Sequence, residues 1–188
     1  MQEEGGKGAA SSRQIGQKID GWSVCWRGGW DKCRVFYVVM VVKRPTPTTK
    51  KKAFTVFMDM GSWWPKDKFA TSVMRGQTVK ALRVDAREGG QIVEVASDGH
   101  EQLWGTIKTY DPYGYLNMDF HIPHPTEKNP GFSTVEVRFT ALGDDLTRVE
   151  LKQSNWEALG DVAKMVQGGY RQAWVMIFEG AYKGACGG

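Results

Sequence analysis

The sequence has few cysteines and no long apolar run, and both absences narrow the class of protein. Among 188 residues there are three cysteines, Cys25, Cys33 and Cys186, without CxxC spacing, so no disulfide framework is expected. The longest apolar run, from Val35 to Val42, is far shorter than the roughly 20 residues that cross a bilayer. We therefore predict a cytoplasmic protein without a membrane span.

Motifs of catalysis and metal binding are also missing. The sequence has no phosphate-binding loop, no dinucleotide fingerprint and no Ser-His-Asp arrangement. Its three histidines, His100, His121 and His124, lack a supporting cysteine or carboxylate at the spacing of a metal site. We expect no metal ion and no cofactor, and we assign no catalytic residue.

The net charge of +4 is concentrated rather than spread. Residues 43–52 hold five basic residues and no acidic one, whereas the chain outside residues 1–34 and 43–52 has 14 basic and 17 acidic residues. Binding of nucleic acid usually requires a wider basic face. We therefore predict no nucleic-acid partner. The basic triplet Lys50 to Lys52 is compatible with a protein partner. The sequence does not determine the oligomeric state.

The chain divides into one domain and two end segments. Residues 1–34 are rich in Gly, Ser and charge without apolar periodicity, which predicts an irregular or disordered extension. Within them Trp22, Trp26 and Trp30 form either part of this irregular segment or a docking arm. Residues 35–183 have the length and composition of one folded domain, and the Gly-rich residues 184–188 are expected to fray.

The first half of the domain begins with a strand and two short helices. Residues 35–42 are β-branched and aromatic, which favours a strand. Thr46 followed by Pro47 predicts a helix start, with an apolar face that continues to Gly61. Ser62 is expected to cap a second helix. Further strands are predicted over residues 78–85 and 91–96.

The pair Asp98-Gly99 is a strong signal for a two-residue hairpin turn. That turn would place Glu94 opposite Leu103, with Trp104 on the other face of the sheet. Glu94 would then be either exposed at an edge or a polar anchor inside a pocket. In the next strand, alternation over Tyr115 to Ile122 assigns His121 to the polar face.

The segment from Thr134 to Gln153 predicts a hairpin with a defined register. Opposite charges favour the pairing of Arg138 with Glu150 and of Glu136 with Lys152, whereas a slip of two residues brings like charges together. After it, Glu157 to Val166 is weakly helical. The final helix is expected to begin at Gly168-Gly169 and to carry an apolar stripe of Tyr170, Trp174, Ile177, Phe178 and Ala181.

Several short motifs, taken in order, resemble the START-like (SRPBCC) superfamily, and more closely the activator-of-heat-shock-protein-ATPase homologue-like family. The resemblance covers roughly residues 36–183, and residues 1–34 and Lys50 to Lys52 depart from it. It implies an α+β helix-grip fold, in which an antiparallel sheet wraps around a long C-terminal helix. The motifs are Ala53 to Phe57, Trp63-Trp64-Pro65, Glu88-Gly89-Gly90, Asp98-Gly99 with Trp104-Gly105, Asp111-Pro112, Val135 to Phe139, Thr147 to Val149, and Tyr170 with Trp174.

The resemblance implies a cavity between sheet and helix, so we expect non-enzymatic binding of a hydrophobic or aromatic small molecule. The alternatives are a cyclase- or hydrolase-like enzyme, for which Glu94 and Tyr170 are the plausible acid or base, and a co-chaperone or stress-response interaction domain. For the first function the expected ligand-binding residues are Phe57, Trp63, Trp64, Glu94, Phe120, Trp156, Tyr170, Trp174 and Phe178.

Overall fold

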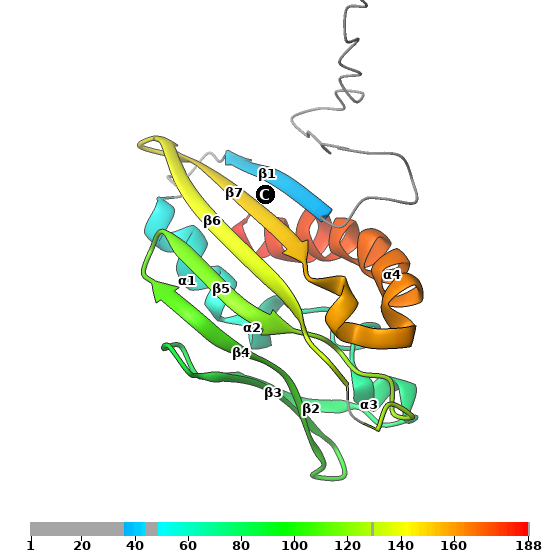
Figure 1. Cartoon of the computed structure of the whole chain (residues 1–188). Coiled ribbons are helices and arrows are strands. Elements are labelled where there is room, and N and C mark those ends of the chain that lie inside the picture. The colour runs from blue at the N-terminus through cyan, green and yellow to red at the C-terminus, as the bar shows by residue number, and fades with distance from the viewer. Residues whose placement is uncertain (1–35, 44–48, 129, 188) are drawn as a thin grey trace, which may run out of the picture.

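Seven strands form one antiparallel sheet in the order β1-β7-β6-β5-β4-β3-β2 (Figure 1). The computed structural model describes residues 36–43, 49–128 and 130–187. The strands predicted at residues 35–42, 78–85 and 91–96 are confirmed to within one residue at each end. The strands are β1 (Phe36–Lys43), β2 (Val79–Val84), β3 (Gln91–Ala96), β4 (Glu101–Asp111), β5 (Tyr115–Phe120), β6 (Ser133–Gly143) and β7 (Leu146–Ser154).

Helices cover the inner face of this sheet, with the long C-terminal segment beside β1 and β7 (Figure 1). The predicted α+β class, a sheet around a long C-terminal helix, is confirmed. No helix within the described ranges is long and apolar enough to cross a membrane. The helices are α1 (Lys50–Met58), α2 (Met60–Trp63), α3 (Thr71–Met74), the 3-10 helix η1 (Trp156–Val162), α4 (Ala163–Val175), the π-helix η2 (Met176–Tyr182) and α5 (Lys183–Cys186).

The first helix buries the face that its sequence predicts, but its cap differs. The expected start at Thr46 and Pro47 lies outside the described residues. Thr49 is the observed cap, because its side chain accepts a hydrogen bond from the Lys52 N–H at 3.2 Å. Ser62 lies inside α2 rather than before it, and its hydroxyl donates to the Asp59 carbonyl.

The start and the end of the C-terminal helix were predicted wrongly. Gly168 and Gly169 lie within α4 and do not begin it. Tertiary packing of the apolar face overrides the helix-breaking tendency of two glycines, which costs about 1 kcal/mol each. The expected fraying from residue 184 is also wrong for residues 184–186, because α5 continues the helix and ends on a buried Cys186.

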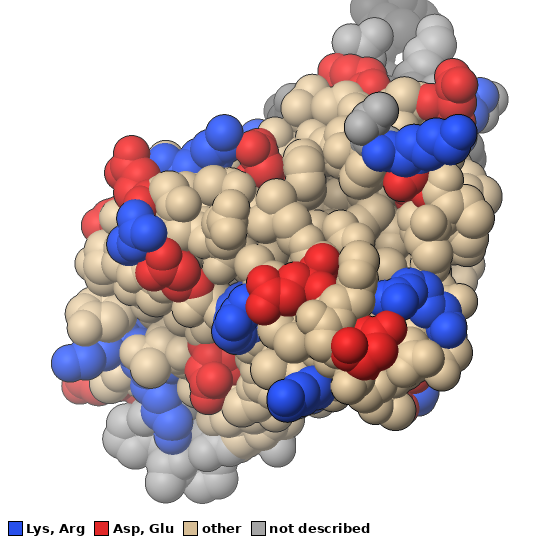
Figure 2. All heavy atoms as spheres, turned by 90° about the horizontal axis from the view of Figure 1, so that it is seen from below, with Lys and Arg blue, Asp and Glu red and all other residues tan. Residues whose placement is uncertain are grey.

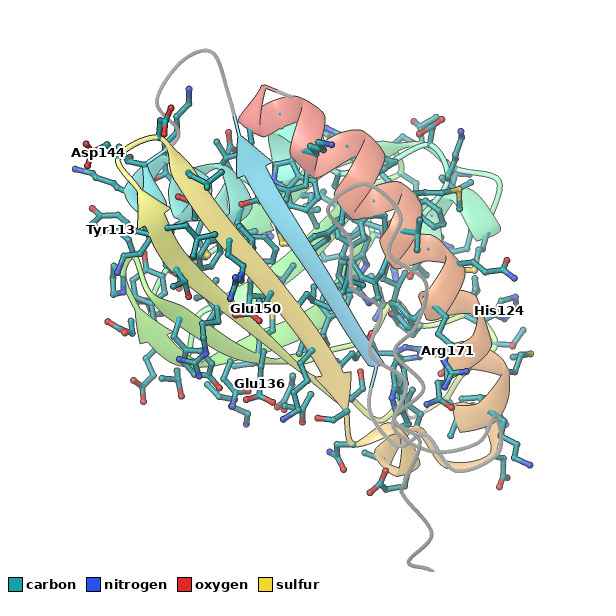
Figure 3. All side chains as sticks on the ribbon, turned by 90° about the horizontal axis from the view of Figure 1, so that it is seen from above. Tyr113, His124, Glu136, Asp144, Glu150 and Arg171 are labelled. Atoms are coloured by element: carbon teal, nitrogen blue, oxygen red, sulfur yellow. The ribbon has the colours of Figure 1, made fainter. Side chains whose placement is uncertain are left out.

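The register of the hairpin β6–β7 is confirmed. Arg138 lies opposite Glu150, and Glu136 lies opposite Lys152 with Nζ and Oε2 2.5 Å apart. Figure 3 shows Glu136 and Glu150 on the strands of this hairpin. The guanidinium of Arg138 also lies over the ring of Tyr115, 5.0 Å from its centroid. Charge complementarity and alternating burial therefore select the same pairing.

The predicted register of β3 and β4 is wrong at Glu94. Glu94 lies opposite Gln102 and not Leu103, because a bulge lies between this pair and Ile92, which lies opposite Gly105. The bulge at Trp104 adds one residue to β4 and turns the indole to the inner face, where it is fully buried. Glu94 and Trp104 therefore share a face, contrary to the hairpin prediction.

The molecular surface viewed in Figure 2 carries both signs of charge. Lys and Arg side chains lie interspersed with Asp and Glu side chains, without a continuous basic area on this face. Ion pairs such as Arg75–Asp98 and Arg83–Glu101 account for part of this pattern. Here the Asp98 carboxylate accepts the His100 N–H and lies near Arg75, and both contacts lower its pKa.

Candidate functional site

An apolar cavity of about 230 Å³ lies between α4 and the segment that contains α3. Residues of α4 form one wall, residues 68–74 form the opposite wall, and Ile122, just after β5, closes a third side. Its lining is mostly apolar: Phe69, Ala70, Met74, Ile122, Val166, Gly169, Ala173 and Ile177, with Lys68 and Tyr170 as the polar contributors.

Helical periodicity builds the α4 wall. Val166, Gly169 or Tyr170, Ala173 and, in η2, Ile177 recur every three or four residues, so they lie on one face of the continuous helical segment. Gly169 is exposed, and a Cβ at this position would meet no described atom within 4 Å. This position therefore leaves room at the edge of the cavity.

A buried carboxylate holds the opposite wall. Glu94 accepts hydrogen bonds from the Thr71 N–H at 2.9 Å, the Ser72 N–H at 2.6 Å and the Trp104 Nε1–H at 2.8 Å. Thr71 is tied a second time, because its hydroxyl donates to the Pro123 carbonyl at 2.8 Å. Buried charges are stable when such donors surround them. Glu94 thus fixes α3 against β3 and β4.

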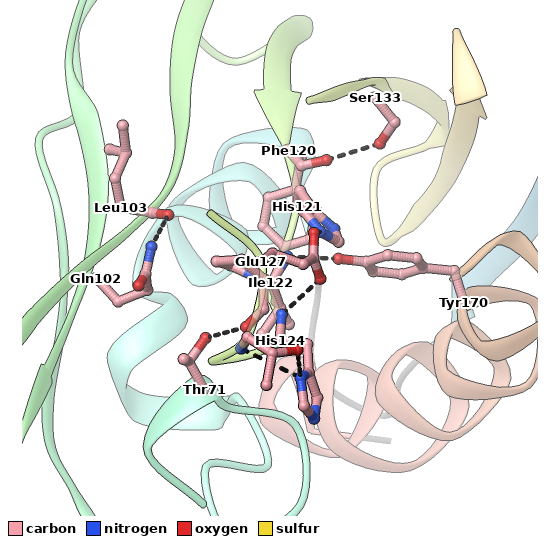
Figure 4. A network of polar contacts seen from close by, with 12 residues as sticks. Thr71, Gln102, Leu103, Phe120, His121, Ile122, His124, Glu127, Ser133 and Tyr170 are labelled. Carbon is pink, nitrogen blue, oxygen red and sulfur yellow. Dashed lines mark hydrogen bonds and ion pairs between the residues drawn. The ribbon is translucent and has the colours of Figure 1, made fainter. Parts of the chain in front are cut away.

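Tyr170 is the aromatic residue of α4 that lines the cavity. Its hydroxyl oxygen accepts the Ile122 N–H at 2.7 Å (Figure 4). Burial raises the pKa of this phenol above its ordinary value, so the hydroxyl keeps its proton at neutral pH. Four aromatic rings hold the tyrosine ring at centroid distances of 5.8 to 6.3 Å, namely Phe120, His121, Trp156 and Trp174.

His121 is buried at 1% exposure, so its predicted place on the polar face is wrong. Strand β5 ends at Phe120, and the alternation that assigned His121 outward ends there too. Its Nε2 lies 2.9 Å from Glu127 Oε2 (Figure 4), while its Nδ1 has no hydrogen-bond partner within the described chain. Glu127 also accepts the His124 N–H, so it anchors the loop after β5.

The structure separates the nine expected ligand-binding residues into two groups. Tyr170 lines the cavity, and Glu94 lies behind one of its walls with both carboxylate oxygens engaged by the protein. The others pack around the cavity or farther along the core: Phe57, Trp63, Trp64, Phe120, Trp156, Trp174 and Phe178, all buried.

Most lining residues were not predicted as site residues. The four-residue helix α3 has no periodic signal in the sequence, so Phe69, Ala70 and Met74 were not recognised. Ile177 was in the predicted stripe of the last helix and Ile122 in the predicted strand pattern. Their signal was present, but apolar residues at core spacing do not distinguish a cavity wall from filled core.

Chemically, the cavity can hold a small apolar guest, and Tyr170 is the one lining residue that carries a hydroxyl group. Among the residues that the structure describes, no group of His, Cys, Asp and Glu has the arrangement of a metal site. The lining itself contains no histidine, thiol or carboxylate.

Comparison with known proteins identifies relatives of this architecture. The family model described as "Activator of Hsp90 ATPase homolog 1-like protein" matches residues 52–179. No curated protein matched the sequence.

Three solved structures illustrate the likeness. The self-sacrificing resistance protein CalC from Micromonospora echinospora is 23% identical, with 81% of this chain and 93% of that chain covered and a TM-score of 0.60. An Arthrobacter aurescens protein is 15% identical, with 87% and 92% covered and a TM-score of 0.58. A Nitrosomonas europaea protein is 12% identical, with 80% and 93% covered and a TM-score of 0.51. At these identities the likeness shows the fold.

Proposed function

The chain belongs to the Activator of Hsp90 ATPase homolog 1-like protein family, and from this premise we propose that it binds a small hydrophobic or aromatic molecule in the cavity beside α4, without chemical turnover. The single observation that carries this proposal is the cavity itself, with its apolar walls and one polar side. The family fold supports a ligand-binding domain; the ligand class and the absence of turnover are our inference.

The energetics are favourable for a guest of modest size. A volume of about 230 Å³ lies just below the usual range of roughly 300–1,000 Å³ for ligand pockets, so a compact guest fits best. Burial of apolar surface contributes about 25 cal/mol per Å², part of which offsets the cost of association. Because Glu94 fixes α3 in advance, little further ordering of this wall is needed on binding.

Binding without turnover is favoured by the composition of the lining. General acid–base catalysis needs a titratable group within hydrogen-bond reach of the substrate. Burial raises the pKa of Tyr170, so its hydroxyl keeps its proton and does not supply a base near neutral pH.

One observation favours a cyclase- or hydrolase-like enzyme as the second candidate. The His121–Glu127 pair is a buried imidazole beside a carboxylate, and the His121 ring lies 6.3 Å from that of Tyr170. Conversion of a bound guest by the wild type, lost in His121→Gln with binding retained, would establish this candidate. Recovery of every tested guest unchanged supports binding alone.

The test of the leading proposal uses a matched pair of glycine variants. N-phenylnaphthylamine, a neutral fluorescent probe, should bind the wild type saturably with roughly one-to-one stoichiometry. Gly169→Leu should fill the edge of the cavity and abolish binding. Gly168→Leu is the control, since this neighbouring glycine is also helical, exposed and free of described atoms around a built Cβ, but does not line the cavity.

Both variants replace a helical glycine and should gain about 0.5–1 kcal/mol of stability. The melting temperature therefore shows that each variant is folded, independently of probe binding. Equal probe affinity in both variants, or binding no tighter than to an unrelated globular protein, contradicts the proposed function.

A further inference from the structure

The hydroxyl group of Tyr170 has one hydrogen-bonding capacity that the described protein does not use. A phenol both accepts and donates a hydrogen bond. Tyr170 accepts the Ile122 N–H at 2.7 Å, and its own hydroxyl donates no hydrogen bond to a described residue. Buried donors in native proteins usually have a partner, so an unused donor at the wall of a cavity points to something that enters the cavity.

The position of this donor is fixed rather than adaptable. The tyrosine is 8% exposed and is held between Trp156, Trp174 and Phe120. The hydroxyl oxygen is held by the Ile122 N–H, and both Tyr170 and Ile122 line the cavity. Because the hydroxyl is held in advance, a hydrogen bond to a guest requires little reorganisation.

Tyr182 provides a comparison, because its hydroxyl proton has an acceptor within the protein. This second buried tyrosine donates its proton to the Ala53 carbonyl at 2.8 Å and does not line the cavity. The protein therefore supplies an acceptor for the hydroxyl proton of Tyr182 but none, among the described residues, for that of Tyr170.

We propose that the ligand of this cavity is an apolar molecule that carries a hydrogen-bond-accepting oxygen, of the carbonyl class, which receives the proton of Tyr170. This inference rests on the proposed function and specifies it further. An acceptor, rather than a second donor, is required because the available group is an O–H. An apolar body is required because the remaining walls are mostly alkyl and aromatic.

The test compares tetralin with tetralone, two bicyclic compounds that differ by one carbonyl group. Dissociation constants are measured by displacement of N-phenylnaphthylamine from wild type, Tyr170→Phe and Tyr182→Phe. In Tyr170→Phe, the affinity for tetralone relative to tetralin should fall about tenfold. The affinity for tetralin itself should stay within about twofold of wild type. Tyr182→Phe removes an equivalent buried hydroxyl away from the cavity and should leave the ratio unchanged.

A second measurement does not depend on any variant. The infrared carbonyl stretch of isotopically labelled tetralone should lie at lower frequency in the wild-type complex than in an alkane solvent, since a hydrogen bond weakens the C=O bond. A stretch at the alkane position, or one ratio shared by all three proteins, overturns this inference while the proposed function stands. If neither compound displaces the probe from wild type, the proposed function itself fails.

Discussion

The C-terminal helical segment carries two buried tyrosines in opposite surroundings. Around Tyr182, the rings of Phe57, Trp63 and Phe178 pack at centroid distances of 5.1 to 5.6 Å, and the hydroxyl donates within the protein. We call this the closed end. Around Tyr170, the aromatic packing borders a cavity and the hydroxyl keeps an unused donor. We call this the open end.

The difference teaches that aromatic density alone does not mark a binding site. Both ends are rich in tryptophan and phenylalanine, and at the closed end these rings fill the core. The open end differs because smaller groups, Gly169 and Ala173, face the short helix α3 across a space. In this fold the site arises where the packing is incomplete, and the predictions below test that contrast.

The largest contrast should come from one substitution made at both ends. Phe57→Ala at the closed end should cost about 3–5 kcal/mol, because a fully buried ring leaves a new cavity. Phe69→Ala at the open end should cost clearly less, about 1–2 kcal/mol, because this ring is half-buried and already borders a space. Urea unfolding with equal m-values measures both. Equal losses would mean that the two ends are packed alike.

Glu94→Gln should loosen one wall of the open end. An amide cannot accept from all three donors, so at least one N–H loses its partner at a cost of about 1–3 kcal/mol. Probe affinity should fall with it, since α3 is held less firmly. Glu101→Gln, at an exposed ion pair with Arg83, is the control and should stay within about 0.5 kcal/mol. Unchanged probe affinity in Glu94→Gln would show that the wall does not depend on this carboxylate.

Alkaline pH should distinguish the two tyrosines. Burial raises the pKa of both, and at Tyr182 the neighbouring Cys186 raises it further. The folded state then holds each proton more tightly than the unfolded chain. This contribution to stability is fully present below about pH 10 and decreases as the pH rises above it, by about 1.4 kcal/mol per pH unit and tyrosine.

Each Tyr→Phe variant should therefore reduce the alkaline slope, as measured by urea unfolding at several pH values. Bound tetralone should stabilise wild type and Tyr182→Phe in this range more than Tyr170→Phe. An alkaline slope that neither variant changes would indicate that other groups determine it.

The smallest effect is expected for substitutions on the outer face of the sheet. These substitutions should affect neither the open end nor the closed end. A double-mutant cycle on Glu136 and Lys152 should give a coupling of about 0.2–1 kcal/mol. Probe affinity should not change in either single variant. A change in probe affinity would mean that the outer face and the cavity are coupled, and the contrast between the ends would then need another explanation.

The architecture was predictable because its signals are local. The alternating pattern and charges of β6 and β7 select one register without knowledge of the rest of the chain. Short motifs in a fixed order sufficed for the family resemblance. The same local reasoning failed at Trp104, where a bulge is stabilised by a hydrogen bond to Glu94 that only the folded sheet brings within reach.

The candidate site was predictable only in part, since a cavity is a property of what several segments leave unfilled. Tyr170 was identified from the aromatic stripe, but the same stripe also named Trp174 and Phe178, which are core. The wall at residues 68–74 depends on a four-residue helix fixed by a carboxylate more than twenty residues away. No short stretch of the sequence contains both the helix and the carboxylate that fixes it.

The pairing of β1 with β7 has a consequence for synthesis of the chain. Strand β1 cannot pair until β7, the last strand, has been synthesised. Helix α4, which covers the inner face, is synthesised later still. Chains are synthesised at about 5–20 residues per second, so the part of the apolar inner face that α4 covers remains exposed for seconds on the ribosome. Long-range pairing of this kind also slows folding. Nascent copies of this protein should therefore be a substrate for holding chaperones until the C-terminal helix emerges.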